Sequence, residues 1–339
     1  MCNSSPEDQA PAEDPRLSEE TVSRTPVDRR TLLKALSYGT LSAAGGLVGW
    51  RLADRWQADH SPGSELPPEI IKAAIESAVD PVSDEGSLRL QAEGSEPIQD
   101  QASYLEKIRN FDEVYAEDVI LDEQQMKILE STARRLTKAQ RVIGHGHFNL
   151  VSFDDLLKYC RRFRSIGRMQ PQELDFLEEI FAADAADYGF FGEKVQTEMT
   201  AVIPERDVVK IAGTGHFLFR GEPENKYAKM CKDLDGNIFL TSGIRSVVKQ
   251  MQLFLDKAVS TDGNLSQASR SLAPPGYSFH AVGDFDIGKV GAGLDNFNEV
   301  FAETDEYKKL VDLGYVELRY TPTNPFGVRH EPWHIKMKA

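Results

Sequence analysis

The chain has 339 residues, of which 40% are apolar and 27% are charged, so it is long enough for one sizeable core and a smaller lobe. Its formal net charge is -15, and it has no basic stripe that could replace the counterions of a phosphate backbone. Composition and charge therefore indicate a globular protein and argue against a nucleic-acid partner.

The first segment of the chain indicates export. Residues 1–27 are polar and acidic and have the composition of a disordered tail. Residues 28–56 then place the adjacent Arg29 and Arg30 shortly before LLK and a short, weakly apolar run, ALSYGTLSAAGGLVGW. This order resembles a bacterial twin-arginine signal, although a basic turn before a short buried helix has the same pattern. We therefore expect the twin-arginine export machinery as a partner and the periplasm or cell envelope as the destination.

The fate of this signal-like segment stays open. No small-x-small cleavage site follows the apolar run, because Trp50, Arg51 and Leu52 come next. The run is also shorter than the roughly twenty apolar residues of a comfortable membrane span. Cleavage and retention as a membrane anchor are both compatible with the sequence.

Residues 57–100 have the composition of a flexible linker, rich in Pro, Ser, Gly and Glu. We expect at most one short helix there, at 68–78, and no catalytic residue.

The three cysteines are far apart in the sequence. Cys2, Cys160 and Cys231 form no C-x-x-C motif, which excludes a cysteine zinc cluster and a dense disulfide scaffold. A disulfide between Cys160 and Cys231 is one alternative. A plain core thiol at Cys160, which lies within an apolar helical pattern, is the other.

Residues 101–195 form a predicted helical accessory region. The stretches DEQQMKILESTARRL and QPQELDFLEEIF repeat apolar residues at helical spacing, and SFDDLLKYCRRF begins with a serine cap. Within this region GHGHFN offers His145 and His147, either as metal ligands or as loop and packing residues. We expect the region to help place a substrate.

Residues 196–339 alternate short strands with helices. Helical patterns lie at 224–234 and 246–259, and strand patterns lie at 236–243, 278–287, 315–321 and 333–337. This irregular mixture predicts an α+β fold, with a small mixed or antiparallel sheet and flanking helices. Neither G-x-x-x-x-G-K nor G-x-G-x-x-G occurs, so nucleotide chemistry has no support.

Near the C-terminus the stretch HEPWH matches the H-E-x-x-H pattern of helical zinc proteases. There, both histidines must face the metal from one helix. Pro332, directly after Glu331, breaks such a helix, and none of the five residues after His334 is a zinc ligand. If this stretch binds zinc, its other ligands must come from upstream.

Those ligands are present in APPGYSFHAVGDFDIG. His280 and Asp286 lie on one predicted extended segment, with Gly283 between them. Two imidazoles and one carboxylate leave a fourth zinc position for water, which is the open arrangement of a hydrolase. His334 completes this set, and Glu331 is close enough in sequence to act as the general base.

With these residues the chain resembles the zinc D-alanyl-D-alanine carboxypeptidases and dipeptidases of the VanY and VanX type. Those proteins carry S-x-H-x-x-G-x-x-x-D for two ligands and E-x-W-H for the base and last ligand. The matching residues here are Ser278, His280, Gly283, Glu331, Trp333 and His334. The resemblance covers roughly residues 200–339 and implies one zinc ion and a peptidoglycan stem peptide as substrate.

A third family motif, S-G-x-R-S followed by Gln on a helix, matches SGIRSVVKQ. By resemblance Arg245 would stabilise the oxyanion that develops on the substrate carbonyl. Ser278 and Gln250 are implied as substrate-binding residues.

The spacing of the first two ligands departs from the family pattern. The family has a step of seven residues from histidine to aspartate, whereas the step from His280 to Asp286 is six. A slip of one residue reverses side-chain direction in a regular strand. We prefer Asp286 as the ligand because apolar residues flank it, and Asp284 remains the alternative.

These observations predict an exported zinc metallopeptidase that removes the C-terminal D-alanine from peptidoglycan stem peptides. Three alternatives remain: an endopeptidase acting on cross-links, a catalytically inactive cell-wall-binding relative, and a partner-binding role for the helical region. Zinc content separates the first of these from the other two.

Overall fold

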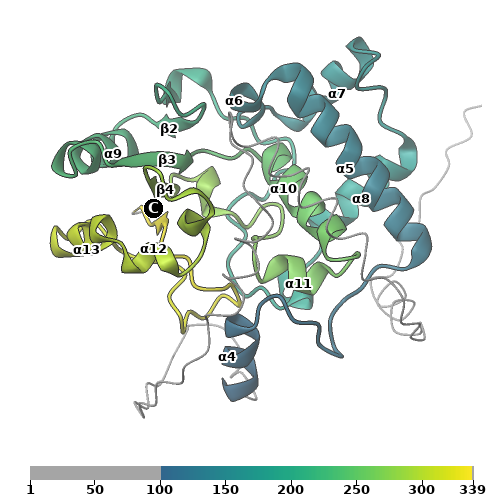
Figure 1. The fold of residues 1–339 in the computed structure, drawn as a ribbon. Coiled ribbons are helices and arrows are strands. Elements are labelled where there is room, and N and C mark those ends of the chain that lie inside the picture. The colour runs from purple at the N-terminus through teal and green to yellow at the C-terminus, as the bar shows by residue number, and fades with distance from the viewer. Residues whose placement is uncertain (1–100, 338–339) are drawn as a thin grey trace, which may run out of the picture. The chain divides into compact units, whose positions relative to one another are not determined.

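The computed structural model describes residues 101–337, and the signal-like segment, the linker and the helix expected at 68–78 lie outside them (Figure 1). The helices are α4 (Gln101–Arg109), α5 (Glu123–Ile143), α6 (His145–Phe148), α7 (Phe153–Arg162), α8 (Pro171–Ala182), α9 (Glu222–Asp233), α10 (Val247–Ser260), α11 (Leu265–Ser269), α12 (Val300–Glu303) and α13 (Asp305–Asp312). The strands are β1 (Val208–Lys210), β2 (Phe217–Phe219), β3 (Ile238–Ser242), β4 (Phe285–Lys289) and β5 (His334–Ile335). Short 3-10 helices are η1 (Ala185–Tyr188), η2 (Glu205–Asp207), η3 (Phe279–Ala281) and η4 (Gly293–Phe297).

Within residues 101–337, no helix has the length and apolar character needed to cross a membrane.

The predicted helices of the accessory region are confirmed, and their ends have clear local causes. Asp122 and Gln125 form a reciprocal capping box at the start of α5. Ser152 accepts a hydrogen bond from the backbone N–H of Asp155 at the start of α7, as the serine-cap pattern predicts. Pro171 occupies the first turn of α8, where its missing N–H costs nothing.

The largest hydrophobic core joins α5, α7 and α8 to α10 and α11, and these helices gather in one part of the ribbon (Figure 1). Leu129 and Leu136 of α5 and Phe254 of α10 are completely buried in it. This core contains residues from both sides of residue 196. The helices of residues 101–195 therefore support α10, which follows the Arg245 motif directly.

A three-stranded antiparallel sheet, in the order β3-β4-β5, carries the C-terminal motifs. A second core packs against it, with Phe285 and Ile287 of β4 and Ile335 of β5 fully buried. A separate antiparallel pair is formed by β1 and β2. The predicted α+β class with a small antiparallel sheet is confirmed.

Two predicted strands are wrong in part or in full. The segment 278–287 is extended only from Phe285, because the backbone turns as η3 and Gly283 then adopts a φ of +129°. Residues 315–321 form no strand. They contact the C-terminal segment through single backbone bonds, from Glu331 N–H to Tyr320 and from Lys336 N–H to Glu317, without a continuous ladder.

Cys160 and Cys231 are both free thiols. Cys160 of α7 is buried in the core shared by α5 and α10, whereas Cys231 of α9 packs against the core of the β3-β4-β5 sheet. The two cysteines thus belong to different cores, and the alternative of a core thiol at Cys160 is confirmed.

Candidate active site

The turn after β3 holds its shape because Gly243 lies directly against another backbone segment. A Cβ atom at Gly243 would come 2.0 Å from the carbonyl oxygen of Phe217, and the N–H of Ile244 donates to that same oxygen at 2.9 Å. The carbonyl of Gly243 accepts a 2.7 Å hydrogen bond from Nδ1 of His280. Because a carbonyl can only accept, Nδ1 of His280 carries a proton, and Nε2 is the nitrogen left to face its other neighbours.

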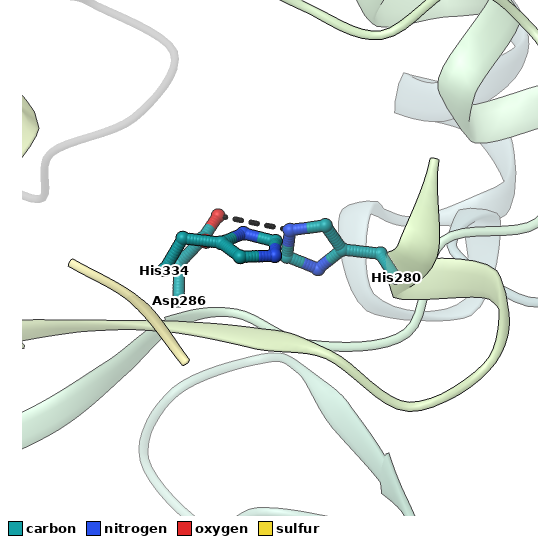
Figure 2. Close-up of side chains that lie close together, drawn as sticks. All are labelled: His280, Asp286 and His334. Atoms are coloured by element: carbon teal, nitrogen blue, oxygen red, sulfur yellow. Dashed lines mark hydrogen bonds and ion pairs between the residues drawn. The ribbon is translucent and has the colours of Figure 1, made fainter. Parts of the chain in front are cut away.

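Three of the predicted site residues converge in one buried cluster (Figure 2). One ligand atom from each of His280, Asp286 and His334 lies within 4.8 Å of the other two. Nε2 of His280 is 3.2 Å from Oδ2 of Asp286, and Nδ1 of His334 is 3.0 Å from Oδ1 of the same carboxylate. Asp286 of β4 and His334 of β5 are direct cross-strand partners, and η3 brings His280 from the opposite side. We call this set the ligand cluster.

The ligand cluster has a donor set that suits zinc. Two imidazole nitrogens and one carboxylate oxygen are a common donor set for catalytic zinc, which keeps a further position for water or substrate. His280, Asp286 and His334 are all at most 4% exposed. Buried acidic and imidazole groups in such proximity require a compensating cation or proton.

The pKa values of His334 and Asp286 are shifted in the directions that favour their charged forms. Burial acts to lower the pKa of His334, but hydrogen bonds to Asp284 and Asp286 outweigh it and raise this pKa to about 9. Burial likewise acts to raise the pKa of Asp286, yet His280 and Arg245 hold it well below its usual range. A nitrogen ligand binds a metal in its neutral form, so zinc binding must displace a proton from His334.

Glu331 lies beside the ligand cluster. Its Oε2 is 4.0 Å from Nδ1 of His334, and its Oε1 is 4.0 Å from Nε of Arg329. Burial raises the pKa of Glu331 to about 7, against the opposing influence of His334 and Arg329. A carboxylate with a pKa near the working pH is well suited to accept and return a proton.

Arg245 borders the same cluster from the turn after β3. Its Nη2 donates to Oδ2 of Asp286 at 2.7 Å, and its Nε donates to the hydroxyl of Ser242 at 2.9 Å. These two bonds hold the guanidinium, and the side chain is 12% exposed.

The two predicted substrate-binding residues are buried. Nε2 of Gln250 donates to the carbonyl of Ala273 at 2.6 Å, while its Oε1 has no hydrogen-bond partner among residues 101–337. Ser278 directly precedes η3 and makes no side-chain capping bond to it. Their predicted contact with substrate stays a prediction.

Although only six residues separate His280 from Asp286 in the sequence, instead of the seven of the family pattern, both side chains lie in the same cluster. Asp286 is the aspartate beside both histidines, because η3 and the turn at Gly283 replace the regular strand in which a slip would reverse the side chain. His147 packs its ring 5.8 Å from that of Phe217 and lies outside the ligand cluster, as does His145.

Sequence reasoning missed three side chains around His334. Arg319 binds the carboxylate of Asp284, Tyr320 places its ring centroid 4.9 Å from that of His334, and Arg329 lies beside Glu331. The sequence predicts Asp284 only as the alternative ligand. An arginine between apolar residues in VELRYT was the available signal, since a buried arginine requires an acidic partner.

The C-terminal part of the chain is similar in sequence to a known protein family. Residues 223–338 match the sequence model of the VanY family, described as D-alanyl-D-alanine carboxypeptidase. No curated protein matches the chain. The matched segment contains the whole ligand cluster together with Arg245 and Glu331.

Three solved structures share low similarity with this chain, each over 39% of its length. One is the LdcB LD-carboxypeptidase, at 22% identity over 68% of that chain and a TM-score of 0.33. Another is a variant of the D,D-pentapeptidase VanY in complex with Zn(II), at 22% identity over 80% of that chain and a TM-score of 0.30. A third is VanYB in complex with D-alanine-D-alanine, at 24% identity over 78% of that chain and a TM-score of 0.31. By its sequence match, the segment from residue 223 to residue 338 is similar to the VanY carboxypeptidase domain.

Proposed function

We propose that this protein is a zinc-dependent peptidase of the cell envelope that removes the C-terminal D-alanine from peptidoglycan stem peptides. The observation that carries the proposal is the ligand cluster with Glu331 beside it, a buried carboxyl whose pKa is raised to about 7. The VanY match over the same residues supports the hydrolase class and the substrate class. The export route rests on the twin-arginine pattern alone.

In this proposal each residue has one task. Nε2 of His280, Asp286 and Nδ1 of His334 would hold one zinc ion, which when bound activates a water molecule and polarises the scissile carbonyl. Glu331 accepts a proton from the attacking water and returns it to the nitrogen of the departing D-alanine. Arg245 donates a hydrogen bond to the scissile carbonyl oxygen as it becomes an oxyanion.

Arg329 favours removal of a terminal residue over cleavage of cross-links. Its guanidinium lies 4.7 Å from the ring centroid of Phe111 and 4.9 Å from that of Trp333, so two aromatic rings hold it beside Glu331. Its Nε is buried and finds no hydrogen-bond partner within the described part of the chain. A guanidinium donor of this kind is suited to the free carboxylate of a C-terminal D-alanine.

Digestion of muropeptides tests the proposal. Purified full-length protein with zinc is incubated with pentapeptide muropeptides, with pentapeptides amidated at the C-terminus, and with cross-linked dimers, and the products are weighed by mass spectrometry. We expect loss of one alanine from the free pentapeptide only, abolished by a chelator and restored by zinc. Cleavage of the cross-linked dimer would show an endopeptidase instead, and loss of alaninamide from the amidated peptide would show that the enzyme does not require the free carboxylate.

A Glu331→Gln variant separates chemistry from metal binding. We expect this variant to retain zinc and to lose activity by about 10²-fold to 10⁴-fold, because it lacks the proton acceptor. Unchanged activity would exclude Glu331 as the base. If the wild-type protein binds no zinc and does not cleave pentapeptides, the result would instead support a non-catalytic wall-binding role.

A further inference from the structure

The second aspartate of the GDFD stretch has a role of its own. We propose that Asp284, held by Arg319, is a positioning residue for His334: it keeps the imidazole proton on Nε2 and so leaves Nδ1 free to bind the metal. The inference rests on the proposed zinc site and deepens it. Asp284 and Asp286 thereby have different tasks toward the same histidine.

The contacts of the His334 ring carry the inference. Its Nε2 lies 2.9 Å from Oδ2 of Asp284, and its Nδ1 lies 3.0 Å from Oδ1 of Asp286. Nδ1 is also the nitrogen nearest to Glu331, at 4.0 Å. The ring therefore presents Nδ1 to the ligand cluster and Nε2 to Asp284. A carboxylate on the far nitrogen of a ligand histidine fixes its tautomer and ring orientation.

Asp284 is itself held rigidly. Oδ2 accepts a 2.7 Å hydrogen bond from Nε of Arg319, and Oδ1 accepts bonds from Nη2 of Arg319 at 3.3 Å and from the backbone N–H of Met337 at 2.8 Å. The Asp284 side chain is only 1% exposed. With the bond to His334, this carboxylate makes four hydrogen bonds to three residues, which together define its orientation.

Arg319 connects this anchor to the other ligand histidine. Its guanidinium carbon lies 3.4 Å from the ring centroid of Phe279, the residue that precedes His280 in η3. Stacking on that ring and pairing with Asp284 therefore place Arg319 between the segments that carry the two histidines. A merely structural ion pair would make the same contacts, so the test must measure the metal site itself.

The matched control is a second buried aspartate that pairs with an arginine away from the cluster. Asp118 accepts bonds from Nη1 of Arg270 at 2.8 Å and from Nη2 at 3.0 Å, and its side chain is 2% exposed. Replacing either aspartate by asparagine removes one buried charge beside an arginine. Only the change at Asp284 alters a group bonded to a proposed zinc ligand.

Zinc affinity of the full-length chain, measured by competition with a chromophoric chelator, is the first readout. We expect Asp284→Asn to weaken zinc binding by about 10-fold to 100-fold, and Asp118→Asn to leave it within about twofold of wild type. Equal zinc affinity of Asp284→Asn and wild type would overturn the positioning role while leaving the proposed function intact. A wild-type protein that binds no zinc would overturn both.

A second measurement requires no folded variant at position 284. Long-range ¹H–¹⁵N spectra of the zinc-loaded wild type, with His334 assigned through a His334→Gln variant, report which nitrogen carries the proton. We expect a protonated Nε2 and a metal-bound Nδ1. A proton on Nδ1, or zinc on Nε2, would contradict the inference even if Asp284→Asn fails to fold.

Discussion

Arg245 lies against Asp286, and in the proposed mechanism it also acts on the substrate. Its Nη2 and Nε donate in two directions, to Asp286 and to Ser242. A planar guanidinium can hold both bonds and keep further N–H groups for a substrate oxygen, which a lysine ammonium on a flexible stem does not reproduce.

We therefore expect Arg245→Lys to lower kcat by about 10²-fold to 10³-fold while KM changes little, because oxyanion stabilisation acts only in the transition state. Steady-state kinetics on zinc-loaded protein, with zinc content checked for each sample, provide the measurement. A variant with normal kcat and a raised KM would instead assign Arg245 to ground-state substrate binding.

At the scale of elements, the turn between β3 and α10 determines the geometry of one side of the site. Gly243 packs against the backbone of Phe217, its carbonyl orients His280, and Arg245 follows two residues later. Helices α5 and α7 of residues 101–195 pack against α10. The accessory region thus shares its core with the helix that follows this turn.

Gly243→Ala tests the close approach at this turn. The added Cβ would lie 2.0 Å from the Phe217 carbonyl oxygen. Because this oxygen belongs to the backbone, relieving the clash requires a shift of the main chain. We expect a loss of about 1–3 kcal/mol in the free energy of unfolding, together with weaker zinc binding, measured by urea unfolding and chelator competition. The control is Gly293→Asn, at a glycine with open surroundings and a left-handed backbone that asparagine tolerates. Similar values for both variants would contradict the role of the turn.

At the scale of the whole molecule, buried arginine–carboxylate pairs join distant segments. Arg135 of α5 binds Glu173 of α8 at 2.7 Å, and Arg270, just after α11, binds Asp118, which precedes α5. Burial acts to raise the pKa of both carboxyls, but the hydrogen bonds from arginine and from neighbouring polar groups together outweigh it, so each pKa is lowered.

These pairs predict a loss of stability in acid. A carboxyl whose pKa is lower in the folded state stabilises the fold above its unfolded pKa of about 4, and this contribution disappears as the pH falls through the folded value. We expect the free energy of unfolding to decrease below about pH 5, measured by urea unfolding between pH 7 and pH 3. In Asp118→Asn this decrease should be shallower. A variant with the same pH slope as wild type would exclude Asp118 as a source of the acid sensitivity.

Much of the fold was predictable because its causes are local. Helices α5 and α10 follow from apolar spacing and side-chain caps, α9 follows from its helical pattern, and β3 follows from a short apolar run bounded by glycine. The strand predicted at 315–321 failed because its residues contact the C-terminal segment at isolated points, and periodicity does not report whether a partner strand is present.

The sequence by itself determined the residue types of the candidate site and their order. The two histidines, the aspartate and the glutamate follow from the donor chemistry of the C-terminal stretches, and Arg245 follows from the resemblance of SGIRSVVKQ to a family motif. Only the tertiary structure decided their relations. Which nitrogen of His334 faces the cluster, and why Asp284 and Asp286 both contact that ring, depend on the pairing of β4 with β5 and on the turn at η3. Side-chain direction between segments far apart in the chain is set by packing, which no local pattern encodes.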